Sequence, residues 1–266
     1  MNKKIDYNVK LGFFIIGIVI SLAVISFFYT PYDPYTMDIS NRFNGISFKH
    51  LLGTDNFGRD IFSRVITGAR FTLFVAICTV TSGTLFGIVL GLTAGYLGGM
   101  ADEIIMRIID AINSFPAILL ALVMVTVLNQ GKYTIIIALC ILFVPSFTRI
   151  VRSGTLQYKN SEFVKLAKVI GASPIRIMFV HILPNIYPTL LSAIVIGLSN
   201  AILAESGMSY LGLGIQPPIP SWGRMLYEAQ THLFHSPLSA FVPGMFIIIT
   251  VLGFNFLGEG IRKRLN

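Results

Sequence analysis

Charge is what this chain lacks most. Asp, Glu, Lys and Arg together make up 12% of its 266 residues, about half of the share that soluble domains carry. Hydrophobic residues make up 54%. So few charges cannot cover a core of this size with a solvated surface, which excludes an ordinary soluble domain and predicts a protein embedded in a membrane.

Cysteine is also scarce, with Cys78 and Cys140 as the two thiols of the chain. Both fall inside apolar runs without a His or acidic residue at the spacing of metal ligands, so the sequence supports neither a zinc site nor a structural disulfide. His232 and His235 are three residues apart, and we interpret them as interfacial residues. We therefore expect no metal site in this chain.

A phosphate-binding loop of the form Gly-x-x-x-x-Gly-Lys-Ser/Thr is missing as well. Gly131 and Lys132 are followed by Tyr133 and lack the upstream glycine of that motif. We expect no cofactor in this chain, and we expect that the chain by itself is not an enzyme.

Six runs without any Asp, Glu, Lys or Arg fill most of the sequence instead. They cover residues 11–29, 71–101, 111–131, 133–148, 177–204 and 229–258. Most exceed the roughly 20 residues that span a bilayer as a helix. The shortest run, residues 133–148, extends to Val151 and becomes long enough to span if the Arg149 and Arg152 side chains reach the lipid headgroups. The sequence predicts an all-α, polytopic membrane protein with six transmembrane helices.

A signal peptide is the alternative interpretation of the first run, because Lys3, Lys4 and Lys10 precede it. Basic residues also precede the apolar part of a signal peptide. The run is long for that role, and its exit at residues 26–31 lacks a small-residue cleavage pattern. We therefore expect it to be retained as a transmembrane helix.

Lysine and arginine are distributed unevenly between the segments that join these runs. With the N-terminus in the cytoplasm, 13 of the 20 basic residues are cytoplasmic: Lys3, Lys4, Lys10, Arg107, Arg149, Arg152, Lys159, Lys165, Lys168, Arg176, Arg262, Lys263 and Arg264. This satisfies the positive-inside rule with both termini in the cytoplasm. Topology and contact with membrane lipid explain the net charge of +8, so no nucleic acid is needed as a partner.

The polar segment between the fourth and fifth runs carries strong helix signals. Asn160 or Ser161 can cap a helix that ends at Gly171. Ser173 and Pro174 then start a second helix, which we expect to end at Pro184. The two helices would meet at an elbow of small residues that another backbone can approach closely. An interfacial helix packed on lipid is the alternative that the pattern leaves open.

Three stretches carry a family resemblance that covers nearly the whole length. They are residues 52–70 with Gly53-Thr54-Asp55 and Gly68-Ala69-Arg70, residues 165–184 with Ala167, Gly171 and Leu183-Pro184, and residues 205–223 with Glu205-Ser206-Gly207 and Ser221-Trp222-Gly223. Asp110 and Phe115-Pro116 match as well. The chain resembles the permease subunits of ABC importers, in the dipeptide, oligopeptide and nickel group. Lys165 and Leu166 replace a Glu and an Ala of the family pattern, which leaves the role of Lys165 open.

The resemblance implies an architecture and a set of partners. It implies the type I importer permease fold, with residues 1–69 as an N-terminal helix and external loop and residues 70–266 as the core, including a coupling loop at about 153–184. Separate cytoplasmic subunits would bind ATP and Mg and would contact the elbow through Lys165, Ala167, Gly171, Ala172, Ser173 and Arg176. A homologous second permease would supply the other half of the path in the inner membrane of a prokaryote.

Two further sets of residues acquire expected roles from the same resemblance. An extracytoplasmic binding protein would contact Asp55, Arg59, Asp60 and Arg64, with an internal salt-bridge cluster as the equal alternative. Asn200, Glu205 and Ser206 would lie on the substrate path or gate, with structural hydrogen bonds as the alternative, because a carboxylate beside an apolar run must face a cavity or a partner. The cargo stays open between dipeptides, oligopeptides, nickel and metal chelates.

Two rival functions find less support in the residues. An ion-gradient-driven secondary transporter or channel would need paired intramembrane ionisable groups or inverted repeats, and neither is apparent. An intramembrane hydrolase would need a nucleophile elbow, but Ser209 lacks the Gly two residues later.

Overall fold

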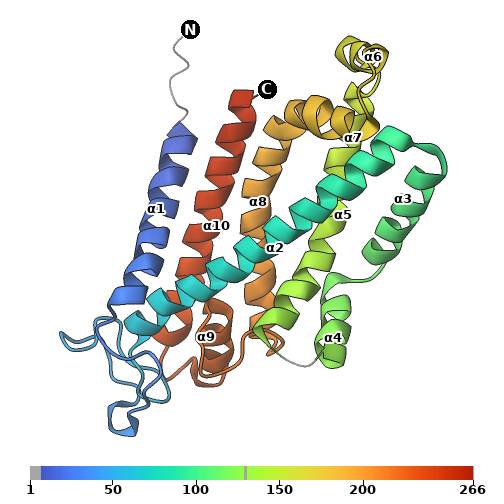
Figure 1. The fold of residues 1–266 in the computed structure, drawn as a ribbon. Coiled ribbons are helices and arrows are strands. Elements are labelled where there is room, and N and C mark those ends of the chain that lie inside the picture. Colours follow the sequence, from blue (N-terminus) through green and yellow to red (C-terminus); the bar gives the residue numbers. More distant parts are fainter. Residues whose placement is uncertain (1–6, 129–130, 266) are drawn as a thin grey trace.

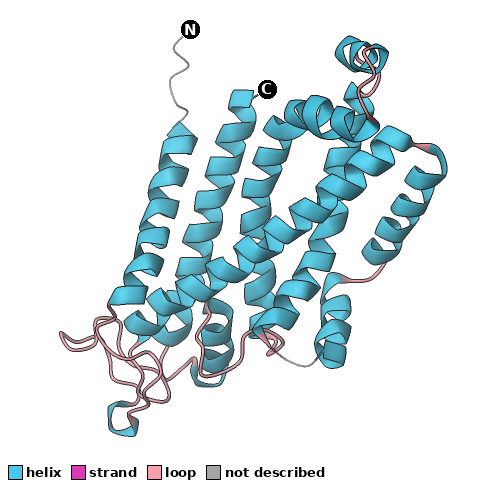
Figure 2. Ribbon diagram, viewed as in Figure 1, coloured by secondary structure: helices cyan, strands magenta, loops and turns pink. Residues whose placement is uncertain are grey.

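The structure is a computed structural model that describes residues 7–128 and 131–265. Within these residues, helices are joined by loops and no β-strand occurs (Figure 2). The helices are α1 (Tyr7–Phe28), η1 (Ile39–Asn41), α2 (Ile61–Leu97), α3 (Gly99–Asn113), α4 (Ala117–Leu128), α5 (Lys132–Tyr158), α6 (Glu162–Val169), α7 (Pro174–Arg176), η2 (Ile177–Ile182), α8 (Leu183–Tyr210), α9 (Trp222–Ala229), η3 (Gln230–His232) and α10 (Leu238–Leu265).

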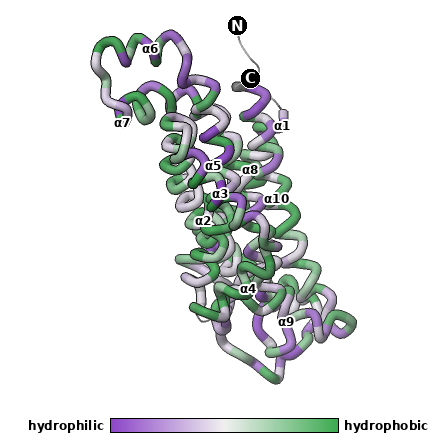
Figure 3. The backbone as a smooth tube through the Cα atoms, turned by 90° about the vertical axis from the view of Figure 1, so that its right-hand side faces the viewer, coloured by the Kyte–Doolittle hydropathy of each residue, from purple (hydrophilic) through white to green (hydrophobic). Residues whose placement is uncertain are grey.

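The long helices form one bundle. Helices α1, α10, α8 and α5 run side by side, and α2 crosses them as a diagonal (Figure 1). Helix α2 has 37 residues and is about 55 Å long, so it must tilt or project beyond a hydrocarbon core of about 30 Å. Hydrophobic residues follow the helices, and hydrophilic stretches gather near α6, near the end of α10 and near α9 (Figure 3). The all-α membrane architecture is therefore confirmed.

Glycines on α2 allow its closest contact, which is with α5. Gly83, Gly87, Gly91 and Gly95 recur every four residues and face α5, where backbone and side-chain atoms of residues 143–155 fill the space that a Cβ atom would need. Small residues at this period let two helix backbones approach closely. The glycine spacing therefore explains how closely α2 packs on α5.

The third of the six expected spans is broken rather than continuous. Among the residues that the structure describes, five helices are long and apolar enough to cross a membrane, and α3 with α4 adds a sixth only as a pair bent by 91°. Helix α3 closes where the Ser114 amide and hydroxyl both donate to the Asp110 carbonyl oxygen, at 2.9 and 2.8 Å. Pro116 then prevents a helical continuation, since it has no N–H and its ring crowds the preceding turn. The run 111–131 is therefore not one continuous helix, since it starts at the end of α3 and continues in α4. Residues 129–130 lie outside the described part.

Two helix boundaries also differ from the prediction. Pro184 does not end the helix that starts at Pro174, because a π-helical turn at Ile177–Ile182 leads directly into α8. The Leu183 amide bonds to the Met178 carbonyl in the i→i+5 pattern of this wider turn, and Pro184 occupies the first turn of α8, where an N–H is dispensable. The sixth span begins at Leu238 rather than at residue 229.

Candidate functional site

The segment 161–176, which we call the elbow, is capped much as predicted. Gly171 has φ = +81°, its amide donates to the Lys168 carbonyl, and the Ala172 amide donates to the Ala167 carbonyl, both at 3.0 Å. This pair of bonds is the Schellman motif, which requires a left-handed residue at its centre. Ser173 then caps α7 by accepting a hydrogen bond from the Arg176 amide at 3.4 Å. The two-helix elbow is confirmed.

The elbow packs on the rest of the chain near the C-terminal ends of α2 and α5. Val164 and Ala167 are buried against the chain itself. The Lys168 ammonium lies 5.4 Å from the centre of the Tyr96 ring, and the Lys159 ammonium donates to the Gly95 carbonyl at 3.1 Å. A force on the elbow therefore reaches the bundle without a flexible linker.

Four large apolar side chains at the elbow face away from the chain. Leu166, Val169, Ile170 and Ile175 are 63–83% exposed, and we call them the elbow tip. They sit beside Gly171, where an added Cβ atom would meet no other atom within 4 Å. Ala167, expected in the contact face, points inward instead, whereas Lys165 is exposed and pairs with Glu162 at 2.8 Å. The sequence analysis did not predict the tip. Its signal is that Leu166 and Val169 lie off the face of α6 that buries Val164 and Ala167.

At the opposite end of the bundle, residues 31–60 fold together with α9 and η3 into what we call the external cap (Figure 1). The side chains of Asp55, Arg59, Asp60 and Arg64 are at most 10% exposed. Arg59 and Arg64 both donate to one oxygen of Glu228 on α9, at 2.5 and 2.9 Å. Asp55, Arg59 and Arg64 thus form an internal salt-bridge cluster with Glu228, which is one of the two alternatives that the sequence left open. Asp60 instead caps α2.

Glu228 is the centre of that cluster. Its second oxygen accepts from the Arg224 guanidinium at 3.1 Å. Burial raises the pKa of Glu228, but the positive charges of Arg64 and Arg59 lower it further, so that its pKa lies below the ordinary 4.5. The carboxylate therefore stays ionised at neutral pH and holds α9 to the first turn of α2. Sequence reasoning did not find this partner, which lies more than 160 residues away from both arginines.

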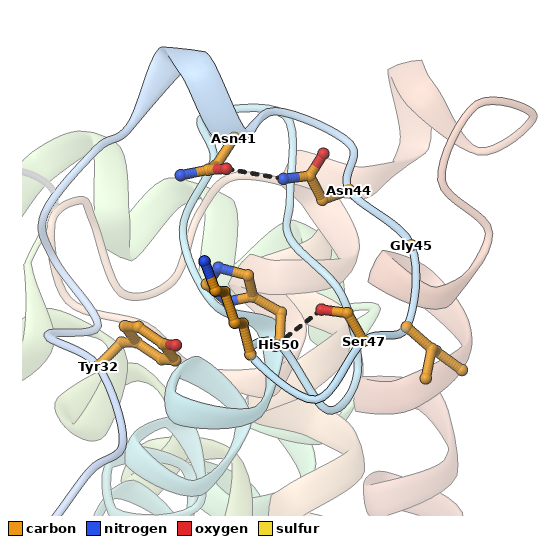
Figure 4. Close-up of a pocket in the computed structure, with 8 residues that line it drawn as sticks. Tyr32, Asn41, Asn44, Gly45, Ser47 and His50 are labelled. Carbon is orange, nitrogen blue, oxygen red and sulfur yellow. Dashed lines mark hydrogen bonds between the residues drawn. The ribbon is translucent and has the colours of Figure 1, made fainter.

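The loop of the external cap also lines a pocket of about 640 Å³ that is open to its surroundings. Asn41 and Asn44 share a hydrogen bond of 2.9 Å on one side, and the His50 ring lies near Tyr32 on the other, with ring centres 4.6 Å apart (Figure 4). His50 also approaches Asp60 at 3.0 Å, where Asp60 caps α2 by accepting from the Ser63 amide. These contacts give the loop a compact fold.

Glu205 lies in the interior, where α8 meets the loop that follows it. It is fully buried and accepts a hydrogen bond from the Ser209 hydroxyl at 2.7 Å. The side chains of Thr72 on α2 and Ser221 before α9 also lie near this carboxylate. Ser206 is buried beside it, whereas Asn200 is exposed on another face of α8. The structure thus brings Glu205 and Ser206 together and leaves Asn200 apart.

Two ion pairs tie the bent α3 to α5 near the elbow. Arg152 binds Asp102 through two hydrogen bonds of 2.6 Å, and Arg149 binds Asp110 at 2.7 Å. The first pair is bidentate, the geometry that fixes a planar guanidinium best. The sequence had assigned Arg149 and Arg152 to the headgroups, so their pairing with α3 is a structural finding.

Comparison with known proteins now decides the family. Residues 87–266 match the model of the "Binding-protein-dependent transport system inner membrane component" family. The chain belongs to this family. It is thus an inner-membrane permease component of a transport system that depends on a binding protein, as the resemblance implied.

Named relatives cover nearly the whole permease. The glutathione transport system permease protein GsiD of Pectobacterium atrosepticum is 39% identical over 97% of this chain and 86% of its own. The dipeptide permease protein DppC of Alkalihalophilus pseudofirmus is 40% identical, and the oligopeptide permease protein OppC of Bacillus subtilis is 38% identical, each over 96% of this chain and 84% of its own. Permease subunits of ABC importers are therefore its relatives.

Solved structures agree on the fold. A structure titled as inward-facing conformations of the MetNI methionine ABC transporter superposes with a TM-score of 0.63 at 18% identity, covering 76% of this chain and 96% of its own. An amino acid ABC transporter superposes with a TM-score of 0.58 at 18% identity, covering 77% and 93%. The importer permease fold is confirmed, and the rival interpretation as an ion-gradient-driven transporter is set aside.

Proposed function

We propose that this permease forms half of the path of an ATP-driven importer whose cargo is a peptide. The relatives named above transport dipeptides, oligopeptides or glutathione, and these cargoes share a peptide backbone. Of the two cargo classes that the sequence left open, peptides are therefore better supported than nickel or metal chelates.

The exposed elbow tip is the observation that carries the coupling part of this proposal. A cluster of four large apolar side chains at the end of the bundle is costly in water and is typical of a protein contact. The tip lies at the same end as the start of α1 and the end of α10 (Figure 1), which the positive-inside rule assigns to the cytoplasm with both termini. Lys3 and Lys4, which add to that rule, lie outside the described residues.

The partner that we assign to the tip is a cytoplasmic ATP-binding subunit that carries ATP and Mg. The contact would be made by the tip together with Lys165, Gly171, Ala172, Ser173 and Arg176, while Ala167 supports it from behind. Because the helix from Pro174 to Tyr210 is continuous, a displacement of the elbow would move α8 as a rigid lever. An importer alternates between a state open to the cytoplasm and a state open to the outside. ATP binding shifts the equilibrium between these two states only if the ATP-binding subunits bind them with different free energies.

A second, homologous permease would complete the path on the side of α3 and α4. Both helices expose large apolar residues, among them Ile104, Ile108, Ile118 and Leu122. On α8, we assign a path position to Asn200, which is exposed, whereas Glu205 and Ser206 hold the end of α8 to the loop below it. The binding protein would dock on the outer surface of the external cap, whose shape Asp55, Arg59, Asp60 and Arg64 fix from within.

The coupling proposal is tested with Gly171→Arg, Gly171→Asn and Val169→Glu in the complete transporter. Arg and Glu place a charge at the contact, whereas Asn adopts a positive φ readily and keeps the residue short. Gly171→Asn is therefore the matched control for backbone strain. We expect the two charged variants to insert normally but to lose co-purifying ATP-binding subunits and ATP-driven dipeptide uptake, at least tenfold.

The outcomes separate coupling from cargo. If Val169→Glu retains its ATP-binding subunits and transports normally, the tip is not the coupling surface. If the subunits associate and hydrolyse ATP in the unmodified transporter, but neither dipeptides nor glutathione are imported, the assigned cargo is wrong and the coupling assignment stands.

A further inference from the structure

An apolar groove of about 670 Å³ runs between α1 and α2 on the outside of the bundle. Its walls on α1 are Ile20, Val24 and Phe27, which recur at helical spacing and are 47–64% exposed. Phe74 and Ile77 form the opposite wall on α2 and are 47% and 52% exposed. Seven residues of helix extend about 10 Å, so the groove covers much of one leaflet of a hydrocarbon core that is about 30 Å thick.

A single cation closes one end of this groove. Arg70 lies among the groove residues, with its guanidinium carbon 4.3 Å from the ring centre of Phe27 and 5.0 Å from that of Phe71. Phe27 is one residue from the end of α1, so Arg70 lies at the level where the apolar helix leaves the membrane. Aromatic residues favour this level, and it is where lipid phosphates lie.

Arg70 differs from three other arginines near the external cap. Arg59, Arg64 and Arg224 each pair with a carboxylate, whereas no carboxylate or carbonyl among the described residues accepts a hydrogen bond from Arg70. A guanidinium has five N–H donors, and it prefers a planar oxyanion acceptor such as a phosphate. Stacking on Phe27 holds the group in place but leaves those donors at its edge unused.

We propose that this groove is a phospholipid-binding site. The phosphodiester would bind to the edge of the Arg70 guanidinium, and one acyl chain would lie between α1 and α2 along Ile20, Val24 and Ile77. The positive charge of Arg70 at the end of the groove matches the phosphate of a lipid, and the apolar walls of the groove match its acyl chain. The lipid belongs to the outer leaflet by the orientation proposed above, which is the one part of the assignment that rests on the proposed function.

The test uses the full permease in phosphatidylcholine nanodiscs with a trace of photoactivatable phosphatidylglycerol, which carries a diazirine on its acyl chain. Diacylglycerol with the same chain serves as the phosphate-free probe. We expect phosphatidylglycerol to label the peptides that contain Ile20 to Phe27 and Phe71 to Ile77 about tenfold more than diacylglycerol does, since one charge-assisted hydrogen bond of this kind is worth at least tenfold in binding.

Variants then assign the preference to its parts. Arg70→Gln is expected to abolish the difference between the two probes, and Val24→Trp is expected to reduce labelling by both, because it fills the groove. Arg42→Gln is the matched control, since Arg42 also lies over a phenylalanine ring, at 5.4 Å from Phe43, but outside the groove. If Arg70→Gln does not fold, Arg70→Lys with its single-point charge is expected to show an intermediate preference.

Three results would overturn the assignment. Equal labelling by the two probes in the unmodified protein would show that the phosphate is not recognised. An unchanged preference in a folded Arg70 variant would place recognition elsewhere. Loss of labelling once the permease is assembled with its partner subunits would show that the groove is covered by protein rather than by lipid.

Discussion

The substitution Gly91→Ala tests how tightly α2 and α5 are packed. A Cβ atom at this position would lie 2.7 Å from both the Thr148 carbonyl oxygen and the Val151 Cβ, and 2.9 Å from the Arg152 amide nitrogen. Two of these atoms belong to the backbone and the third to a stiff β-branched side chain, so no rotamer change relieves the overlap. The helices must separate by several tenths of an ångström, which in a well-packed core costs about 1–3 kcal/mol.

The same exchange has an opposite intrinsic effect, because alanine is favoured over glycine in a helix by about 0.5–1 kcal/mol. Gly17→Ala on α1 measures that effect alone, since nothing lies within 4 Å of its Cβ position. We expect Gly91→Ala to lower the melting temperature by about 5 °C, and Gly17→Ala to leave it unchanged or raise it. The assay is size-exclusion chromatography of purified protein after heating in detergent. A Gly91→Ala protein as stable as Gly17→Ala would refute the packing argument.

Three further predictions concern charge. Glu228→Gln leaves two buried arginines without their carboxylate and should lower the free energy of unfolding by about 3 kcal/mol. Glu103→Gln removes an exposed ion pair and should change that free energy by less than about 1 kcal/mol. Equal effects of the two variants in a thermal unfolding comparison would contradict the buried cluster. The pKa of Glu228 in the folded protein lies below 4.5, so its contribution to stability is complete above pH 4.5 and is lost as the pH falls through that folded-state pKa. The unfolding temperature of Glu228→Gln should therefore fall less in acid than that of the unmodified protein. Asp102→Asn should free α3 from Arg152 and raise amide hydrogen exchange in α3 while exchange in α1 stays constant; equal exchange in both proteins would show that the ion pair does not hold the helix.

Local sequence signals were enough for much of the fold. The apolar runs located the transmembrane helices because a lipid-exposed helix must be apolar along its whole length. The elbow was predictable at residue level, since Gly171, Ser173 and Pro174 act through backbone bonds to near neighbours. The sequence did not predict the break before Pro116, and it wrongly predicted a helix end at Pro184. A proline permits either a break or a continued helix, and the surrounding packing decides between them.

The sites depended more on contacts that are distant in sequence. Asp55, Arg59 and Arg64 could be interpreted as a binding surface or as an internal cluster, and only the approach of Glu228 on α9 decided for the cluster. Glu205 could be recognised from the sequence as a carboxylate that is costly to bury, but its neighbours Thr72 and Ser221 come from other segments. Which face of α6 is buried also required the tertiary structure, because Ala167 faces inward only through its packing on the rest of the bundle.

By itself the sequence determined that this protein crosses the membrane, where its helices lie and where a capped elbow interrupts them, because hydrophobicity and capping act within a few residues. Only the tertiary structure decided which charges are buried in pairs, which apolar side chains at the elbow remain exposed, and that Arg70 has aromatic rings but, among the described residues, no carboxylate beside it. These properties arise when helices far apart in the chain pack together, and no local pattern encodes that packing.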